Sequence, residues 1–412
     1  MYDYLFKMFH QVDSQSFEEE YNMRFNGFGT TKIPLRIKPY KTNETFTLFY
    51  VNTRDLVYKS NKIYQQDNII RTLKNKLPAI AKQDFINNHI INELYSTNVL
   101  EGVQSSRQEI VESTRELAIN PHKKVRLKNM IHSYQKLLSG NVHAIKNPED
   151  IRYIYDDLVK DEIVEKHHML DGKLFREDVT NVFKGSGTGQ IIHQGIYPEQ
   201  RIIEALKELL SFLNNEPNIP LLFKVAIGHY YFGYIHPFYD GNGRTSRFIS
   251  SVFLQKEFNH LTALSLSNGC NKNKRAYLDA FEQTNSFKNK GELTYFCDVF
   301  FDILIDSQNN IIAELKEKDL LLSAFYKSHI QQNKKLTNEN QRQILFVIAQ
   351  NYFFAMDEKG MSRTILTHAC DLSEYMIKKE TDELIEKNLI RTIKKRPIIY
   401  QLNEEYFNLG TN

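Results

Sequence analysis

The sequence predicts a mainly α-helical protein with a small β-hairpin, an N-terminal arm and a C-terminal winged-helix domain. Apolar residues recur at helical spacing over most of residues 63–326. One glycine-rich segment, residues 174–201, interrupts this pattern and is typical of a hairpin. Beyond residue 341, three helical patterns precede a β-rich, basic segment, which is the order of elements in a winged helix.

Composition places the chain among globular proteins. Its 412 residues suggest two or three domains, and 41% hydrophobic with 25% charged residues is typical of a folded protein. The longest apolar runs, such as residues 299–305, are too short to cross a bilayer, and we find no signal peptide, so we expect a cytoplasmic protein without a membrane partner. The three cysteines are far apart and contain no C-x-x-C pair. A net charge of +3 is too small to indicate a nucleic-acid partner.

We expect three regions along the chain: an N-terminal arm with helices at 1–84, a helical core at 85–328, and a linker with a winged-helix domain at 329–412. Residues 34–58 mix β-branched and aromatic residues with turn signals, which predicts short strands or an irregular arm. Residues 220–235 are apolar nearly all round, which predicts a buried central helix. The other expected core helices lie at 84–103, 106–118, 128–140, 148–161, 199–214, 247–258, 275–285 and 292–326.

The C-terminal region offers a second class of function, that of a DNA-binding regulator. Residues 335–412 carry as many basic as acidic side chains, and the expected recognition helix, 373–386, has two lysines against five acidic residues. A helix that faces phosphates should not be acidic. We therefore expect this region to dock a protein, to form a homo-oligomer or to give structural support.

The segment "YIHPFYDGNGRTSR", residues 234–247, carries the chemistry. The apolar helix must end at His236 because Pro237 disfavours helical geometry in the residue before it. A second helix then begins near Arg244, so a glycine-rich loop lies at a helix N-terminus, where free N–H groups and the helix dipole favour an anion. Arg244 and Arg247 lie on one side of this helix, and two guanidinium groups beside such a loop suggest a polyphosphate.

Two further residues of this segment complete the expected site. Asp240 would hold Mg²⁺, which prefers a carboxylate together with phosphate oxygens and water. His236, at the entrance of the loop, would be the base that takes a proton from an attacking hydroxyl.

This segment resembles the signature of the Fic family, H-P-F-x-[DE]-G-N-[GK]-R, at every position from His236 to Arg244. The resemblance implies an all-α core that transfers AMP from ATP to a hydroxyl of a target protein, or of the chain itself, with Mg²⁺. It implies that His236 is the general base and that Phe238 anchors the loop. The resemblance implies that Arg244 and Arg247 hold the β- and γ-phosphates. The nucleotide-binding residues that it implies within the segment are Asp240, Gly241, Asn242, Gly243, Arg244, Thr245, Ser246 and Arg247.

The resemblance extends over about residues 85–310. The hairpin segment 174–201 resembles the flap that aligns the target as an added strand, although only Pro198 remains of a His and Pro-Pro pattern. Tyr277 and Asn285 resemble residues near the nucleoside, whereas Leu278 departs from the family's second tyrosine. The flap residues expected beside the nucleotide are Ile192, His193, Gln194 and Gly195.

Upstream, "STNVLEGV" at 96–103 has the form [ST]-x-x-x-E-[GN] from Thr97 to Gly102. Thr97 and Glu101 share a helix face, and Gly102 is expected to end the helix. The family's inhibitory motif has this form. The resemblance implies that Glu101 pairs with Arg247 and blocks the γ-phosphate position.

Three alternatives stay open at this stage. The reverse reaction, hydrolytic removal of AMP, would use the same site with Glu101 orienting a water. The DNA-binding regulator is the second alternative. The third concerns His229, two turns before His236, which is either a buried core histidine or a second catalytic group.

Overall fold

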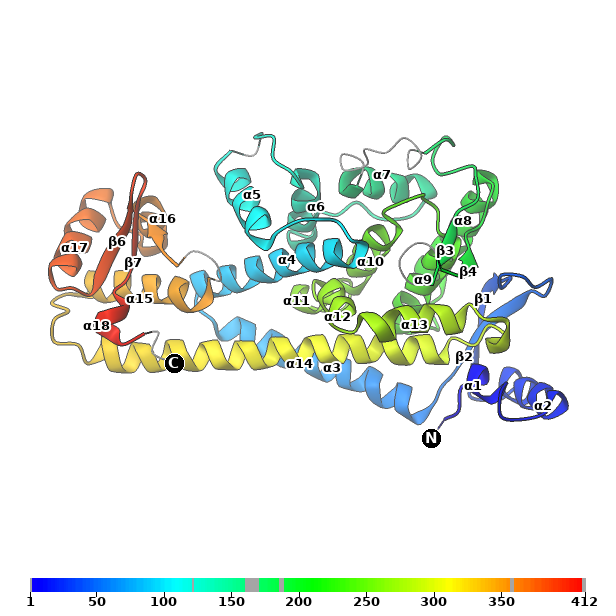
Figure 1. Ribbon diagram of the computed structural model, residues 1–412. Helices are drawn as coiled ribbons and strands as arrows, with labels where there is room; N and C mark the ends of the chain where they lie inside the picture. The colour runs from blue at the N-terminus through cyan, green and yellow to red at the C-terminus, as the bar shows by residue number, and fades with distance from the viewer. Residues whose placement is uncertain (1, 121, 160–169, 185–188, 356–358, 410–412) are drawn as a thin grey trace. The chain divides into compact units, whose positions relative to one another are not determined.

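The computed structural model describes residues 2–120, 122–159, 170–184, 189–355 and 359–409, and it confirms a mainly helical fold with small sheets (Figure 1). The strands are β1 (Thr30–Ile37), β2 (Phe46–Val51), β3 (Asn181–Phe183), β4 (Ile191–Gln194), β5 (Met361–Ser362), β6 (Ile390–Lys395) and β7 (Ile398–Leu402). The helices are α1 (Leu5–Met8), α2 (Ser14–Phe25), α3 (Arg54–Lys76), α4 (Ala79–Glu101), α5 (Arg107–Ile119), α6 (Lys128–Leu138), α7 (Pro148–Val159), α8 (Glu199–Asn215), α9 (Leu221–Ile235), α10 (Asn242–Leu254), α11 (His260–Ala263), α12 (Leu266–Lys272), α13 (Lys274–Thr284), α14 (Thr294–Phe325), α15 (Glu339–Phe354), α16 (Arg363–Cys370), α17 (Glu374–Glu386) and α18 (Glu404–Phe407), with a 3₁₀ turn at Phe287–Asn289 and a π-helical turn at Tyr326–Gln331.

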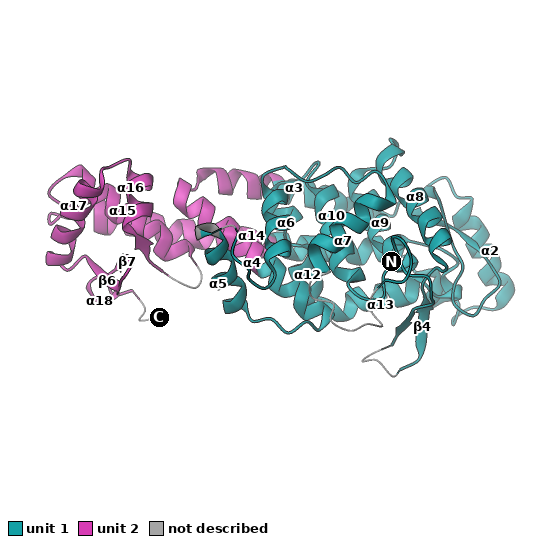
Figure 2. Ribbon diagram, turned by 90° about the horizontal axis from the view of Figure 1, so that it is seen from above, with its two compact units in different colours: residues 1–67, 92–308 teal, residues 68–91, 309–412 magenta. Residues whose placement is uncertain are grey.

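The chain forms two compact units, and the first contains residues 1–67 and 92–308 (Figure 2). Its centre is α9, which is buried at every position except Lys224 and Gly233, as its all-round apolar sequence predicts. Helices α8 and α10 pack against α9. The hairpin β3–β4 is a separate two-stranded antiparallel sheet of the same unit.

The N-terminal arm belongs to this first unit. Strands β1 and β2 pair antiparallel, and the Phe49 backbone bonds Gly291 and Leu293 at the start of α14. Helix α3 begins at Arg54, earlier than the sequence pattern suggested. Leu56 and Ile63, seven residues apart on one face of the helix, are fully buried and hold its first turns on the core.

The second unit contains residues 68–91 and 309–412. Helices α15, α16 and α17 pack with an antiparallel sheet of order β5-β7-β6, and their assignment as a winged helix stays a prediction. Within this unit, residues 84 and 88 of α4 bond α15 directly. Asp84 accepts from Asn351 at 2.9 Å, and Asn88 donates to the Phe354 carbonyl at 2.5 Å.

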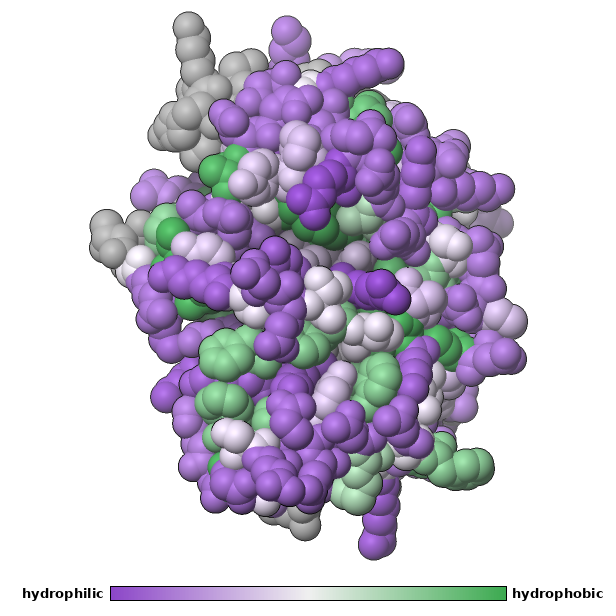
Figure 3. Space-filling model, turned by 90° about the vertical axis from the view of Figure 1, so that its right-hand side faces the viewer, coloured by the Kyte–Doolittle hydropathy of each residue, from purple (hydrophilic) through white to green (hydrophobic). Residues whose placement is uncertain are grey.

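No helix in the described part of the chain is long and apolar enough to cross a membrane. The face of the molecule in Figure 3 is mostly hydrophilic, with hydrophobic residues in small separate groups.

Candidate functional site

The loop between α9 and α10 has the shape that the sequence predicts. Helix α9 ends at Ile235, and His236 takes a left-handed conformation (φ 52°, ψ 61°) while its N–H donates to the Phe232 carbonyl at 2.9 Å. Asn242 fixes the loop from its far end. Its side chain accepts from the Phe238 N–H at 3.0 Å and donates to the Phe238 carbonyl at 2.7 Å.

Phe238 anchors this loop in the core. Its side chain is fully buried, and its ring lies 3.8 Å from the Tyr155 ring of α7 with an angle of 11° between the planes. The loop is therefore held both by a stacked aromatic pair and by the Asn242 amide.

The N-terminus of α10 follows directly. Gly241 has φ 79°, and a Cβ atom at this residue would overlap Val159, so glycine is required for both reasons. The Asp240 carboxylate accepts from the Gly241 N–H at 2.6 Å and lies 3.7 Å from Nη2 of Arg244. The first turn of α10 presents backbone N–H groups and the positive end of the helix dipole, which together favour an anion.

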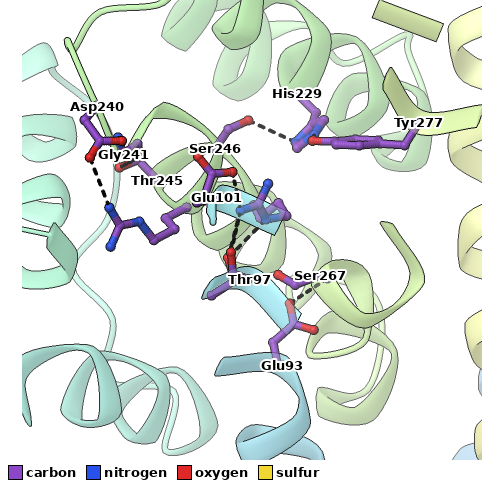
Figure 4. Close-up of polar contacts among 12 residues, drawn as sticks. Glu93, Thr97, Glu101, His229, Asp240, Gly241, Thr245, Ser246, Ser267 and Tyr277 are labelled. Atoms are coloured by element: carbon purple, nitrogen blue, oxygen red, sulfur yellow. Dashed lines mark hydrogen bonds and ion pairs between the residues drawn. The ribbon is translucent and has the colours of Figure 1, made fainter. Parts of the chain in front are cut away.

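Helix α4 meets α10 through the residues that the upstream motif singles out (Figure 4). Nη2 of Arg247 donates to Oε1 of Glu101 at 2.8 Å and to Oγ1 of Thr97 at 2.9 Å, and Nε donates to the same threonine oxygen at 3.1 Å. Arg247 is 1% exposed. Helix α4 ends after Glu101 because Gly102 has φ 74°, as expected.

The Glu101 carboxylate also touches the first turn of α10. A Cβ atom added to Gly243 would overlap Oε1 of Glu101 and would lie 2.8 Å from Nη1 of Arg247. The carboxylate therefore lies where the sequence predicts an anion: at a helix N-terminus and against a buried guanidinium.

Sequence reasoning missed a second acidic residue of α4. Glu93 is fully buried and accepts from the backbone N–H groups of Ser267 at 2.8 Å and Asn268 at 3.1 Å, at the start of α12. Burial raises the pKa of Glu93 to about 7. Its spacing of four from Thr97 and eight from Glu101 places it on the same helix face, and that spacing was the available signal.

Comparison with known proteins identifies the domain that carries this loop. Residues 145–254 match the model of the Fic/DOC family, and the matched segment contains His236, the loop and α10. The chain carries a Fic domain. Thr97 and Glu101 lie outside the matched segment.

Two curated relatives each match about a quarter of the chain. The chain is 30% identical over 109 residues to the protein adenylyltransferase fic-1 of Caenorhabditis elegans, covering 25% of this chain and 20% of that protein. It is 29% identical over 103 residues to the protein adenylyltransferase fic-1 of Caenorhabditis briggsae, covering 23% and 19%. The chain thus spans about a fifth of the length of these relatives.

A solved structure shares the fold over most of the chain. It is the crystal structure of a Fic family protein from Desulfovibrio desulfuricans, with a TM-score of 0.51, 16% sequence identity, and coverage of 86% of this chain and 97% of that one.

The segment expected to form the flap contains the hairpin β3–β4, in which Asn181 pairs with Gln194 and Val182 with His193. Residues 185–188, the expected hairpin tip, lie outside the described residues. The flap residues expected to contact the nucleotide differ in their burial. Ile192 and Gln194 are half-buried, whereas His193 is 2% exposed and its Nε2 lies 2.6 Å from the Tyr234 carbonyl of α9.

Thr245 and Ser246 are turned inward in α10. The Thr245 hydroxyl donates to the Gly241 carbonyl at 2.9 Å, and the Ser246 hydroxyl lies 3.0 Å from Nδ1 of His229. A direct contact of either side chain with a nucleotide would require these bonds to break.

His229 is a buried histidine with polar partners on two helices. Its Nε2 lies 2.8 Å from the Tyr277 hydroxyl, and its Nδ1 also lies 2.9 Å from the Ser250 hydroxyl. Tyr277 is buried, as is Asn285, whose Oδ1 accepts from the Tyr230 hydroxyl at 2.8 Å. The structure therefore places the two residues expected near the nucleoside in bonds within the domain, and their contact with a nucleotide stays a prediction.

The histidines of the Fic domain core are held in the neutral form. Desolvation, together with the positive charge of Arg176 and the nearby His193, lowers the pKa of His236 to about 3. Burial likewise lowers the pKa of His193 to about 4 and of His229 to about 3. A neutral imidazole at position 236 can accept a proton.

Asp240 fits the Mg²⁺ ion that the family implies. Its side chain is 40% exposed at the mouth of the loop, beside the N-terminal turn of α10 where phosphates would bind. Mg²⁺ in such sites commonly takes one or two carboxylates and fills its remaining positions with phosphate oxygens and water.

Proposed function

We propose that this protein transfers AMP from ATP to a hydroxyl group of a protein, and that Glu101 holds the enzyme inactive. The observation that carries the proposal is the position of the Glu101 carboxylate. It is bound to Arg247 and lies against the first turn of α10, the helix that begins after the His236 loop. A carboxylate in this place imitates a phosphate. The adenylyltransferase name of the relatives supports AMP as the transferred group.

In the proposed reaction, the hydroxyl oxygen of the target attacks the α-phosphorus of ATP. Its proton passes to the neutral imidazole of His236, and the bond between the α-phosphorus and the bridging oxygen breaks, so that pyrophosphate leaves. The N-terminal N–H groups of α10, Arg244 and Arg247 hold the phosphates in line for this displacement. Mg²⁺ held by Asp240 would neutralise charge on the departing pyrophosphate.

Inhibition follows from competition for one guanidinium. While the guanidinium of Arg247 bonds Thr97 and Glu101, it cannot form two hydrogen bonds to the γ-phosphate. ATP would then bind without the contact that aligns its α-phosphate for attack. Release of the C-terminal turn of α4 is the step that turns the enzyme on.

The test uses the full chain with ATP labelled either on the α- or on the γ-phosphate. The wild type, Glu101→Gly and Glu101→Gly/His236→Ala are incubated alone and with cell lysate, and modified proteins are identified by mass spectrometry. We expect α-label, but no γ-label, to join protein with Glu101→Gly and to vanish with the double variant. Retention of γ-label would indicate phosphate transfer, and no label on any protein would refute the proposal. A target already carrying AMP, incubated with the wild type, reveals whether removal of AMP is the dominant reaction.

A further inference from the structure

Arg176 is a fully buried arginine in the segment that leads into the flap. Its guanidinium donates to backbone carbonyls from three places in the chain. Nε and Nη2 donate to the His236 carbonyl at 2.9 and 2.8 Å, Nη2 donates to the Ile196 carbonyl at 2.7 Å, and Nη1 donates to the Asp178 carbonyl. One side chain thus ties both ends of the flap to the residue expected to be the base.

These bonds cap the C-terminal end of α9. The last carbonyls of a helix lack partners within the helix, and the negative end of the helix dipole favours a cation there. The Tyr234 carbonyl is met by His193, and the Ile235 carbonyl by the Ile196 N–H at 3.0 Å. The His236 carbonyl is met by Arg176. The last two carbonyls of α9 and that of its cap residue His236 are therefore satisfied by the flap and by the residues that flank it.

Gly195 lets the flap backbone approach this end of α9. A Cβ atom at residue 195 would overlap Nη2 of Arg176 and would lie 3.0 Å from Cβ of His236. The contact leaves no room for a larger residue, so the position of the flap and the position of His236 are coupled.

His236 needs such support because of its backbone. A residue other than glycine in the left-handed region is strained, and this strain persists only where the surroundings hold it. The Asn242 amide fixes the loop beyond Phe238, and Arg176 fixes the His236 carbonyl before it.

We propose that Arg176 is a positioning residue for the transfer reaction, which holds the His236 backbone and the flap in one geometry by capping α9. The inference rests on the proposed AMP transfer, since it assigns His236 the role of base. The positive charge of Arg176 also lies near the His236 imidazole, and together with burial and His193 it keeps the pKa of His236 low.

The experiment compares Arg176→Gln and Arg176→Lys in the Glu101→Gly background. Arg152→Gln is the matched control. Arg152, on α7, also donates to a backbone carbonyl of the segment before the flap, that of Leu174, at 2.8 Å. We measure kcat, KM for ATP and the pKa of His236 by NMR titration. Arg176→Gln should lower kcat about 100-fold, the scale of a misplaced catalytic group, with KM for ATP within about threefold. It should also raise the His236 pKa, whereas Arg176→Lys keeps the charge, leaves that pKa unchanged and loses less kcat.

Arg152→Gln should retain kcat within about threefold and leave the His236 pKa unchanged. Equal losses of kcat in Arg152→Gln and Arg176→Gln, or an unchanged His236 pKa in Arg176→Gln, would overturn the inference. If Arg176→Gln fails to fold, Gly195→Ala tests the same contact, and it should likewise lower kcat more than it raises KM. If the Glu101→Gly parent transfers no AMP, the proposed function fails, and the His236 titration still decides whether Arg176 holds this residue.

Discussion

Oε1 of Glu101 accepts a hydrogen bond from Nη2 of Arg247 at 2.8 Å, although 146 residues separate the two in the chain. Burial alone would lower the pKa of Arg247, but the Glu101 carboxylate, together with Tyr277 and Cys270, raises it above its ordinary value. Removing one partner of a buried pair leaves the other charge in need of a new partner. Under the proposed function, the γ-phosphate of ATP is that partner.

Glu101→Gly should therefore raise AMP transfer by at least about tenfold, since hydrogen bonds to charged groups contribute about 1.5–3 kcal/mol each. The measurement is the initial rate of α-label incorporation with the full chain. Glu112→Gly, which removes an exposed glutamate of α5, is the control and should leave the rate unchanged. A flat or lower rate for Glu101→Gly in a folded protein would assign Glu101 to structure or to AMP removal.

His236→Ala in the Glu101→Gly background should abolish transfer while ATP affinity stays within about threefold, because the phosphates are held by arginines and backbone N–H groups. Calorimetry measures the affinity. His122→Ala, at an exposed position, should change neither quantity. Full transfer activity in His236→Ala would rule out its role as the base.

The rate of transfer should not fall between about pH 7 and 6 as it would if the protonation of an ordinary histidine stopped the reaction. The pKa of His236 is lowered from 6.5 to about 3, so the neutral, proton-accepting form persists as the pH falls. For Glu101→Gly, kcat/KM should change less than about threefold between pH 8 and 5.5, whereas an ordinary histidine would cost about tenfold. Circular dichroism at each pH checks that the fold is retained. A tenfold decline with an intact fold would contradict a neutral His236.

Glu93→Ala should loosen α4 on α12. The change leaves the Ser267 and Asn268 N–H groups without their acceptor, which should cost about 1–3 kcal/mol of unfolding free energy. Urea unfolding measures this loss, and transfer should rise by less than it does in Glu101→Gly. Glu93→Gln keeps an oxygen acceptor and should lie between wild type and alanine in both assays. Unchanged stability in Glu93→Ala would show that these two bonds do not hold the helix.

The full chain should not bind mixed-sequence duplex DNA with sub-micromolar affinity at about 0.15 M salt. Helix α17 is net acidic, and its Glu380 accepts from Asn338 and Gln341 within the second unit. Lys394, Lys395 and Arg396 form a small exposed basic group at the turn between β6 and β7, the expected wing. Fluorescence anisotropy measures binding. Tight binding that disappears in the triple alanine variant of the wing would instead support a DNA-binding regulator.

The local features of the site could be predicted because they are encoded in neighbouring residues. Pro237 and the glycines determine where α9 ends and α10 begins, and the structure confirms both. The contact between Glu101 and Arg247 was expected from the motif on α4, and it is present. Its inhibitory role stays a prediction.

The remaining features depend on contacts between distant segments, which leave no periodic pattern. Arg176 bonds backbone carbonyls, and any residue type supplies a carbonyl, so its partners cannot be read from side chains. The inward turn of His193 likewise depends on the Tyr234 carbonyl. The contact between α4 and α15 could not be predicted either, because Asn88 bonds a backbone carbonyl 266 residues later.

The order of Thr97, Glu101 and Arg247 along the chain has a consequence for biosynthesis. Chains leave the ribosome from the N-terminus, so α4 is made before α10. The acceptors of the Arg247 guanidinium are therefore always present before the arginine itself is translated. A chain released early lacks the arginine, and a chain long enough to contain it already carries the glutamate. Under the proposed function, interrupted translation from the first residue would therefore not yield a transferase that has Arg247 but lacks Glu101.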